Sequence, residues 1–271
     1  MNRYKEAKLL YEQGKSLRKI SEELNINRKL LSRKLKEDGI IIRDPNKNSI
    51  SKSKRIHELN ETIFEVIDTE EKAYWLGFLY ADGYIDKEKG FELTLKESDY
   101  DHLIKFQKFM QCDNNIAYRS QQKAYRIGIY SKKIAQDLIN LGCFQAKSFT
   151  LKFPTSEQVP EDLIHHFMRG YFDGDGCITY GQGQLRFSVI GTPEFLNDYE
   201  AYLLTALNRT TVNKRLRRFD WTENTETINY SGNKQVNKIF NFLYKNATIY
   251  LERKYAKYIA VLGQKEENKE S

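Results

Sequence analysis

Apolar positions recur three to four residues apart over residues 1–43, a spacing that predicts short helices packed around one small core. Gly14 is expected to end the first helix and Ser16 to begin the second. A tight turn at 25–27 then leads into a third helix over 28–35. The residues expected to form the core are Leu17, Ile20, Leu24, Ile26, Leu31 and Leu35.

Beyond a polar stretch at 44–68, which is typical of a linker, helical and two-residue periods follow one another in the same order twice. The expected helices are 69–83, 99–111 and 132–141, then 160–174, 193–207, 234–246 and 249–262, with hairpins between them. The pattern predicts an α+β fold of two αββαββα units, 69–159 and 160–265, related by a pseudo-twofold axis and followed by a polar tail at 266–271.

Charge changes this picture at the N-terminus. The 271 residues carry a net charge of +7. Residues 1–43 hold 12 Lys and Arg against 6 Asp and Glu, whereas the remaining residues hold 32 against 31. An anionic partner is therefore expected to bind the first segment. We expect no membrane partner and a cytoplasmic location, because no long apolar run and no signal peptide is evident and the three cysteines form no pair.

The basic segment resembles a helix-turn-helix, whose last helix enters the DNA major groove. The outward face of that helix would offer cationic and polar groups to phosphates and base edges. The residues expected there are Arg28, Lys29, Ser32, Arg33 and Lys36. The alternative is a basic three-helix bundle that binds a protein or has no partner.

Two fragments of the repeated part share one shape, "LGFLYADG" at 76–83 and "RGYFDGDG" at 169–176. In each, two small residues stand four positions apart and so share one helix face. They are Gly77 with Ala81, and Gly170 with Gly174. Because glycine inside a helix costs about 1 kcal/mol relative to alanine, a close helix–helix contact is the expected compensation. The two helices should therefore pack together on the pseudo-twofold axis.

This packing would bring Asp82 and Asp175 together at the C-terminal ends of the two helices. Gly83 and Gly176 are expected to end each helix in a left-handed turn. The two carboxylates would repel each other and the helix dipoles, which a divalent cation would relieve. Mg²⁺ or Mn²⁺ suits such a site, since Mg²⁺ keeps several waters and accepts phosphate oxygens. Alternatively, each Asp-Gly pair only ends a helix.

At these residues the sequence resembles the LAGLIDADG homing endonucleases, over about seven-tenths of the chain. The resemblance implies a monomer whose two β-sheets form a saddle over the major groove of double-stranded DNA, and metal bound by the last acid of each motif. Those acids are Asp82 and Asp175. The sixth motif position, Tyr80 in one copy and Asp173 in the other, is not a metal ligand in the family.

The resemblance also implies a basic residue near each scissile phosphate. "FQAKSFTLKFP" nominates Lys147 in the first unit, and "IYLERKY" nominates Arg253 or Lys254 in the second. A cation there would stabilise the transition state or help to activate water. Glu97 is a weaker candidate for holding the attacking water, because its counterpart in the second unit is about Gly191.

Residues that read DNA are expected on the strands, where side chains able to pair with bases and phosphates are dense. They are Arg119, Gln121, Lys123 and Arg126 in the first unit and Lys214, Arg215, Arg217 and Arg218 in the second. Three functions fit this pattern: a metal-dependent DNA endonuclease, a DNA-binding regulator that has lost cleavage, and an RNA-binding helper of intron splicing. The two acids favour the endonuclease, because a regulator has no need of repelling carboxylates on its axis.

Overall fold

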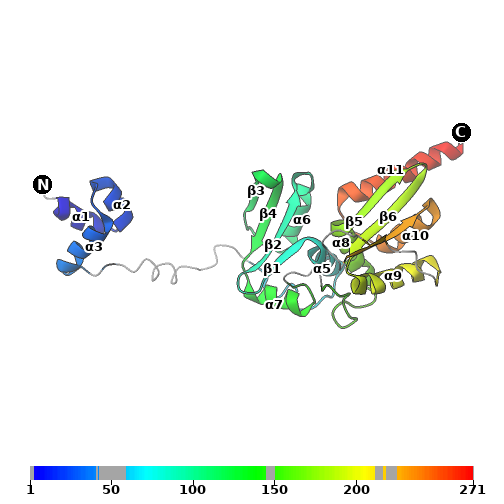
Figure 1. The fold of residues 1–271 in the computed structure, drawn as a ribbon, viewed down its shortest axis with the longest axis horizontal. Coiled ribbons are helices and arrows are strands. Elements are labelled where there is room, and N and C mark those ends of the chain that lie inside the picture. The colour runs from blue at the N-terminus through cyan, green and yellow to red at the C-terminus, as the bar shows by residue number, and fades with distance from the viewer. Residues whose placement is uncertain are drawn as a thin grey trace. The chain divides into compact units, whose positions relative to one another are not determined.

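The computed structural model describes residues 3–40, 42, 59–144, 150–210, 216–217 and 225–270. The chain divides into two compact units, Met1–Ile56 and His57–Ser271. Figure 1 shows the helices of the first unit and the two sheets of the second.

In the described residues of the first unit there are three helices, as the sequence predicts. They are α1 (Arg3–Glu12), α2 (Leu17–Leu24) and α3 (Arg28–Glu37). The Ser16 hydroxyl accepts a hydrogen bond from the Lys19 amide at 3.3 Å, and the Asn27 side chain accepts from the first turn of α3. These caps satisfy amides that a helix start leaves unpaired. Buried Ile20, Leu31 and other apolar side chains form a separate core in the first unit.

As far as the chain is described, the second unit holds two four-stranded sheets whose strand pairings are antiparallel. The first sheet has the order β1 (Gly83–Asp86), β2 (Gly90–Lys96), β4 (Ala124–Ile129) and β3 (Ile116–Arg119). The second has the order β5 (Gly176–Gly181), β6 (Gln184–Gly191), β8 (Glu226–Ser231) and β7 (Leu216–Arg217). The two strand orders are equivalent, which confirms the α+β fold and the repeat.

Helices and strands follow the same αββαββα order in each half, and a further helix, α11 (Glu252–Glu270), follows the second half. The first half has α5 (Glu70–Asp82), the 3-10 turns η1 (Glu97–Asp99) and η2 (Ser120–Gln122), α6 (Tyr100–Phe109) and α7 (Lys132–Asn140). The second half has α8 (Ile164–Asp175), α9 (Pro193–Leu207) and α10 (Asn233–Leu243). In Figure 1, α5 and α8 lie between the two sheets.

Several helix bounds differ from the sequence prediction, and the largest differences are in α8 and α11. The helix expected from residue 160 begins at Ile164, because a turn at 161–163 precedes it. The last helix begins at Glu252 rather than at 249 and continues through Glu270, beyond the expected end. None of the helices in the described residues has the length and apolar character of a membrane span.

Candidate active site at the paired helix ends

α5 and α8 pack backbone to backbone through reciprocal glycines. A Cβ atom at Gly77 would lie 2.0 Å from the carbonyl oxygen of Phe167, and one at Gly170 would lie 1.9 Å from that of Tyr74. Each carbonyl belongs to the residue three positions before the glycine of its own helix. The contact therefore obeys the pseudo-twofold symmetry, and it is closer than any side chain would permit.

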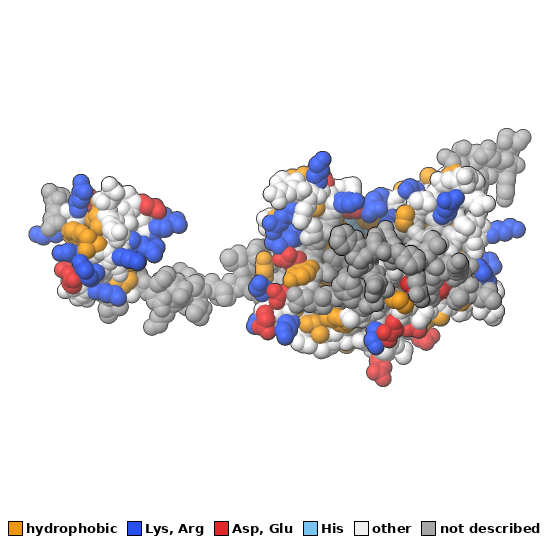
Figure 2. All heavy atoms as spheres, viewed as in Figure 1, with side chains coloured by type: hydrophobic (Ala, Val, Ile, Leu, Met, Phe, Trp, Pro, Cys, Tyr) orange, Lys and Arg blue, Asp and Glu red, His pale blue; other side chains and the backbone are white. Residues whose placement is uncertain are grey.

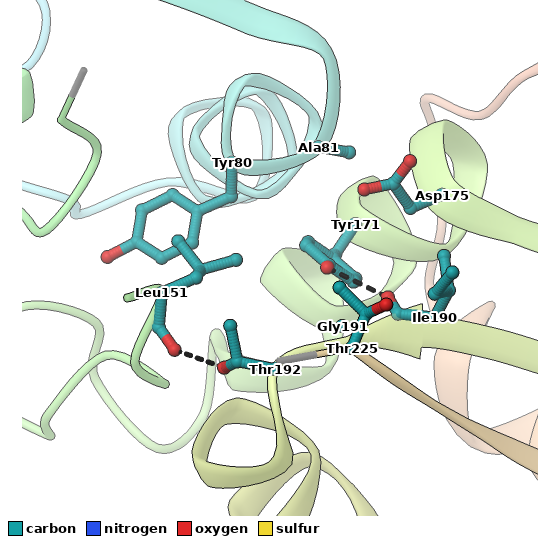
Figure 3. Close-up of a pocket in the computed structure, with 9 residues that line it drawn as sticks. All are labelled: Tyr80, Ala81, Leu151, Tyr171, Asp175, Ile190, Gly191, Thr192 and Thr225. Atoms are coloured by element: carbon teal, nitrogen blue, oxygen red, sulfur yellow. Dashed lines mark hydrogen bonds between the residues drawn. The ribbon is translucent and has the colours of Figure 1, made fainter. Parts of the chain in front are cut away.

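The close contact between the two helices continues to their C-terminal ends, where the two acids lie. A Cβ atom at Gly174 would lie 2.3 Å from the Cβ of Ala81 and 3.2 Å from Oδ2 of Asp82. The carboxylate of Asp82 is thus beside the last turn of α8, which ends at Asp175. Figure 3 shows the carboxylate of Asp175 beside Ala81 of α5. Each motif acid faces the opposite helix.

A pocket of about 190 Å³ opens next to Asp175. Ala81 from α5 and Tyr171 from α8 line it, together with the end of β6. The Tyr171 hydroxyl donates to the carbonyl oxygen of Ile190 at 2.9 Å, which ties α8 to that strand (Figure 3). The acid therefore lies at the edge of a small, shaped cavity.

The glycines after the acids do not form the left-handed turns that the sequence predicts. Gly83 has φ −75° and ψ 139°, and Gly176 has φ −91° and ψ 164°, so both are extended. Each glycine already begins a strand, and the strand lies close against the helix that it leaves. A Cβ at Gly83 would lie 2.7 Å from the Leu79 carbonyl oxygen, and one at Gly176 would lie 2.1 Å from the Phe172 ring. Close approach, and not backbone handedness, requires glycine here.

Lys254, at the start of α11, caps the helix end that carries Asp175. Its buried Nζ donates to the carbonyl oxygens of Phe172 at 2.7 Å, Gly174 at 3.2 Å and Gly176 at 2.5 Å. Burial lowers the pKa of this ammonium to about 8, while Asp173 and both motif aspartates favour the charged form. A cation at a helix C-terminus also offsets the negative end of the dipole.

The other two basic candidates differ from Lys254. Arg253 Nε donates to both carboxylate oxygens of Asp99, at 2.8 and 3.0 Å, and so joins α11 to η1 of the first half. Lys147 lies outside the described residues. Glu97, in η1, is exposed. Of these four candidates, Lys254 is the one that the described contacts tie to a motif helix end.

The two acids fit a hydrated divalent ion. No group of three or more His, Cys, Asp and Glu side chains in the described part of the chain forms a closed metal site. Mg²⁺ commonly takes only one or two carboxylates and completes its shell with water and phosphate oxygens. Asp82 and Asp175, on adjacent helix ends, would supply two such carboxylates.

A second acid of the motif, Asp173, is fully buried and belongs to a hydrogen-bond network that the sequence does not reveal. Its oxygens accept from the hydroxyls of Tyr74 at 2.8 Å and Tyr244 at 2.9 Å, and from the Leu251 amide at 2.7 Å. Burial raises the pKa of this carboxyl group above its ordinary value. The Tyr74 hydroxyl also contacts His102 Nε2 at 2.9 Å, and burial lowers the pKa of His102 to about 3.

Arg169 is a fully buried cation at the opposite end of the helix pair. It donates to Glu70 Oε1 at 2.7 Å, to His166 Nδ1 at 2.7 Å, and to the carbonyl oxygens of Leu243 and Ile249. Glu70 begins α5, so the ion pair joins the two motif helices. Removal of one partner would leave the other charge buried and unpaired.

These buried groups make the two motif copies unequal. The counterparts of Arg169 and Asp173, 93 positions earlier, are Leu76 and Tyr80. The Tyr80 hydroxyl donates to the Leu141 carbonyl after α7, whereas Asp173 accepts from the segment before α11. The sixth motif residue thus anchors the chain near the end of each half, with opposite hydrogen-bond polarity. It has a structural contact in both copies.

Three of the four predicted DNA-reading residues of the first half line one hollow at the first sheet. Arg119, Gln121 and Arg126 line a hollow of about 540 Å³, together with Glu92 and Thr94. Lys123 is the exposed residue that follows η2, with a positive φ of 47°. In the second half, Lys214, Arg215 and Arg218 lie outside the described residues, and only the backbone of Arg217, in β7, is described.

In the first unit, α3 presents the predicted polar face. Arg28, Lys29, Arg33 and Lys36 are exposed and Ser32 is partly buried. Figure 2 shows many Lys and Arg side chains and few Asp and Glu side chains on the visible face of this unit. Arg33 also lies 3.6 Å from Glu37, one turn later.

The larger unit is thus defined by two equivalent αββαββα halves whose first helices meet at paired acids. No protein-family model matches the sequence, and no curated protein matches it. Its structural neighbours are LAGLIDADG homing endonucleases.

A lysine-to-alanine mutant of I-SmaMI has 11% identity and a TM-score of 0.50, over 72% of this chain and 92% of that one. I-SmaMI bound to cleaved DNA has 12% identity and a TM-score of 0.48, over 75% and 92%. I-LtrWI bound to target DNA has 11% identity and a TM-score of 0.41, over 74% and 97%. At such identities the similarity shows a shared fold.

Proposed function

We propose that the protein is a site-specific endonuclease that hydrolyses both strands of duplex DNA with a divalent metal. The observation that carries this proposal is the close pairing of Asp82 and Asp175 at two helix ends. Close helix packing through two glycine–backbone contacts and the Gly174–Ala81 contact holds these like charges together. Such repulsion is a cost that a metal site explains and that a purely structural helix pair does not.

Asp82 and Asp175 would hold the metal ions, which supply charge neutralisation and a more acidic bound water when present. Lys254 holds a positive charge at the end of α8, where the negative charge of a phosphate undergoing attack would accumulate. The Arg169–Glu70 ion pair fixes the register of α5 against α8 from the other end. The two acids would therefore keep their spacing when DNA binds.

The remaining parts fit a DNA partner. Polar and cationic side chains on the outer face of the first sheet would contact one side of the target. The basic face of α3 would extend the footprint as a helix-turn-helix. Since both acids belong to one chain, a second subunit is not needed, and we expect a monomer. Solved structures of I-SmaMI and I-LtrWI, bound to DNA, are consistent with this partner.

The test begins with selection of cleaved sequences from a random duplex library in the presence of Mg²⁺ or Mn²⁺. We expect one preferred site, double-strand cleavage that excess EDTA abolishes, and a monomer by sedimentation. Cleavage that persists in EDTA would contradict the metal assignment. Specific binding without any cleavage would favour a regulator, and preferential binding of a folded intron RNA would favour a splicing helper.

A further inference from the structure

One ion pair lies on the outer face of the first sheet, within the hollow. Arg126 Nη1 of β4 donates to Glu92 Oε2 of β2 at 2.6 Å. Both side chains are partly exposed, at 28% and 29%. Their neighbours Leu93 and Ile127 are buried in the core, so alternation places the pair on the opposite face. The core does not need this charge pair.

A carboxylate on a DNA-binding face is unfavourable unless it has a specific task. It is repelled by phosphates, and it occupies part of an arginine that would otherwise bind them. In the major groove, however, carboxylates accept from the amino group of cytosine, and arginine donates to guanine. Glu92 therefore fits a role in base selection better than a role in general affinity.

The spacing of the pair matches one base pair. In a G·C pair, guanine O6 and cytosine N4 lie side by side, one hydrogen bond apart, at about 2.9 Å. Arg126 and Glu92 also present a donor beside an acceptor, 2.6 Å apart. The arginine would face the guanine acceptors while the carboxylate faces the cytosine amino group. In an A·T pair the thymine O4 acceptor also lies beside the adenine N6 donor, but the thymine methyl group takes the place of the guanine N7 acceptor, so the arginine would lose one of its two acceptors.

The second sheet has no equivalent pair at the corresponding place. Gly83 pairs with Leu93 and Gly176 pairs with Val189, which aligns β2 with β6. Leu93 and Val189 pair in turn with Ile127 and Ile228, which aligns β4 with β8. One residue earlier on each strand, Glu92 and Arg126 correspond to Ser188 and Thr227. Both of these are uncharged and partly buried.

We propose that Glu92 and Arg126 together select one G·C base pair in the half of the target under the first sheet, and that the second sheet makes no such selection at the symmetry-related position. This inference rests on the proposed DNA function. Arg126 supplies the contact to guanine. Glu92 orients that arginine and excludes other base pairs, so it is a specificity-determining residue.

The experiment is a selection of bound sequences from a random duplex library without metal, so that no cleavage removes them. It compares the wild type with Glu92→Ser/Arg126→Thr, which copies the second sheet, and with Ser188→Glu/Thr227→Arg, which copies the pair into the second sheet. We expect the first variant to lower the G·C preference at one position by about five- to a hundredfold. The second variant should create a G·C preference at the symmetry-related position.

A third variant, Glu92→Gln, separates selection from affinity. It keeps the side-chain shape and removes one negative charge, so binding to random-sequence DNA should rise while the G·C preference falls. Melting temperatures of all variants identify any loss that is due to unfolding. Unchanged preferences in the first variant and in Glu92→Gln would overturn the inference while leaving the proposed function intact. A wild type that enriches no sequence would overturn both.

Discussion

Gly77 and Gly170 each pack against the backbone of the opposite motif helix. A Cβ atom at either position would come within 2.0 Å of a carbonyl oxygen of that helix. Neither oxygen can move without disturbing its own helix. We predict that Gly77→Ala and Gly170→Ala each lower the free energy of unfolding by about 2 kcal/mol or more, despite the better helix propensity of alanine. Chemical denaturation measures the loss.

Gly181→Ala is the matched control for this prediction. No atom lies within 4 Å of a Cβ at Gly181, in β5, so the change in the free energy of unfolding should stay within about 0.5 kcal/mol. Equal effects of all three substitutions would show that the close contact between α5 and α8 does not stabilise the fold.

We predict that Asp82→Asn and Asp175→Asn each lower the rate of DNA cleavage by at least about a hundredfold, because each removes a charged oxygen from the metal site. Metal-free DNA binding should be preserved or tighter, since an anion near the phosphates is gone. The melting temperature should not fall, because the two acids repel each other. Cleavage near the wild-type rate in either variant would exclude that aspartate as a ligand.

Two substitutions test whether Lys254 or Arg253 is the basic residue that supports cleavage. Lys254→Met leaves three carbonyl oxygens at the end of α8 without their cation, so we expect both slower cleavage and a loss of about 1–3 kcal/mol in stability. Arg253→Met breaks only the contact with Asp99, and cleavage should persist. Rates are measured well below both melting temperatures. A lower cleavage rate in Arg253→Met than in Lys254→Met would assign the role near the scissile phosphate to Arg253.

Acid should destabilise the protein through His102. Its folded pKa of about 3 lies below the ordinary value of 6.5, so the unfolded chain binds more protons between these two values. The free energy of unfolding that depends on neutral His102 is therefore lost as the pH falls from 6.5 towards 3, and the loss at pH 5 is about 2 kcal/mol. In His102→Phe the difference in stability between pH 7 and pH 5 should shrink by this amount. Denaturation curves at the two pH values provide the check.

Removal of residues 1–43 should weaken binding to the selected target and flatten its salt dependence. Each lost phosphate contact lowers the slope of log affinity against log salt by about 0.9. Cleavage of a short target at saturating protein should survive, since both acids remain. Substitution of Arg28 and Lys29 by Gln in the full chain should reproduce part of the effect. An unchanged affinity and slope would refute the helix-turn-helix assignment.

Much of this fold can be predicted because local patterns and tertiary structure agree. Thr69 caps α5 by accepting from the Lys72 amide, and the spacing of Gly77 and Ala81 indicates the helix contact. The buried polar groups could not be predicted in the same way. Arg169 and Asp173 look like surface residues in a single sequence, and, apart from His166, their hydrogen-bond partners lie some 70 to 100 positions away.

The conformation of Gly83 could not be predicted either. An Asp-Gly pair at a helix end usually signals a left-handed turn. Here the reason for glycine is the proximity of the following strand to Leu79, which only the tertiary structure reveals. The pairing of Glu92 with Arg126 was likewise hidden, because it depends on strand register.

The direct passage from each motif helix into a strand has a mechanical consequence. Asp82 is the last residue of α5 and Gly83 the first of β1, and Asp175 and Gly176 repeat this junction. The acid is thus connected directly to the following strand, with no loop residue between them. Exchange of side chains along a strand would change which bases the strand contacts and leave the position of the acid unchanged. Insertion of a single residue at the junction would instead shift the acid relative to those bases.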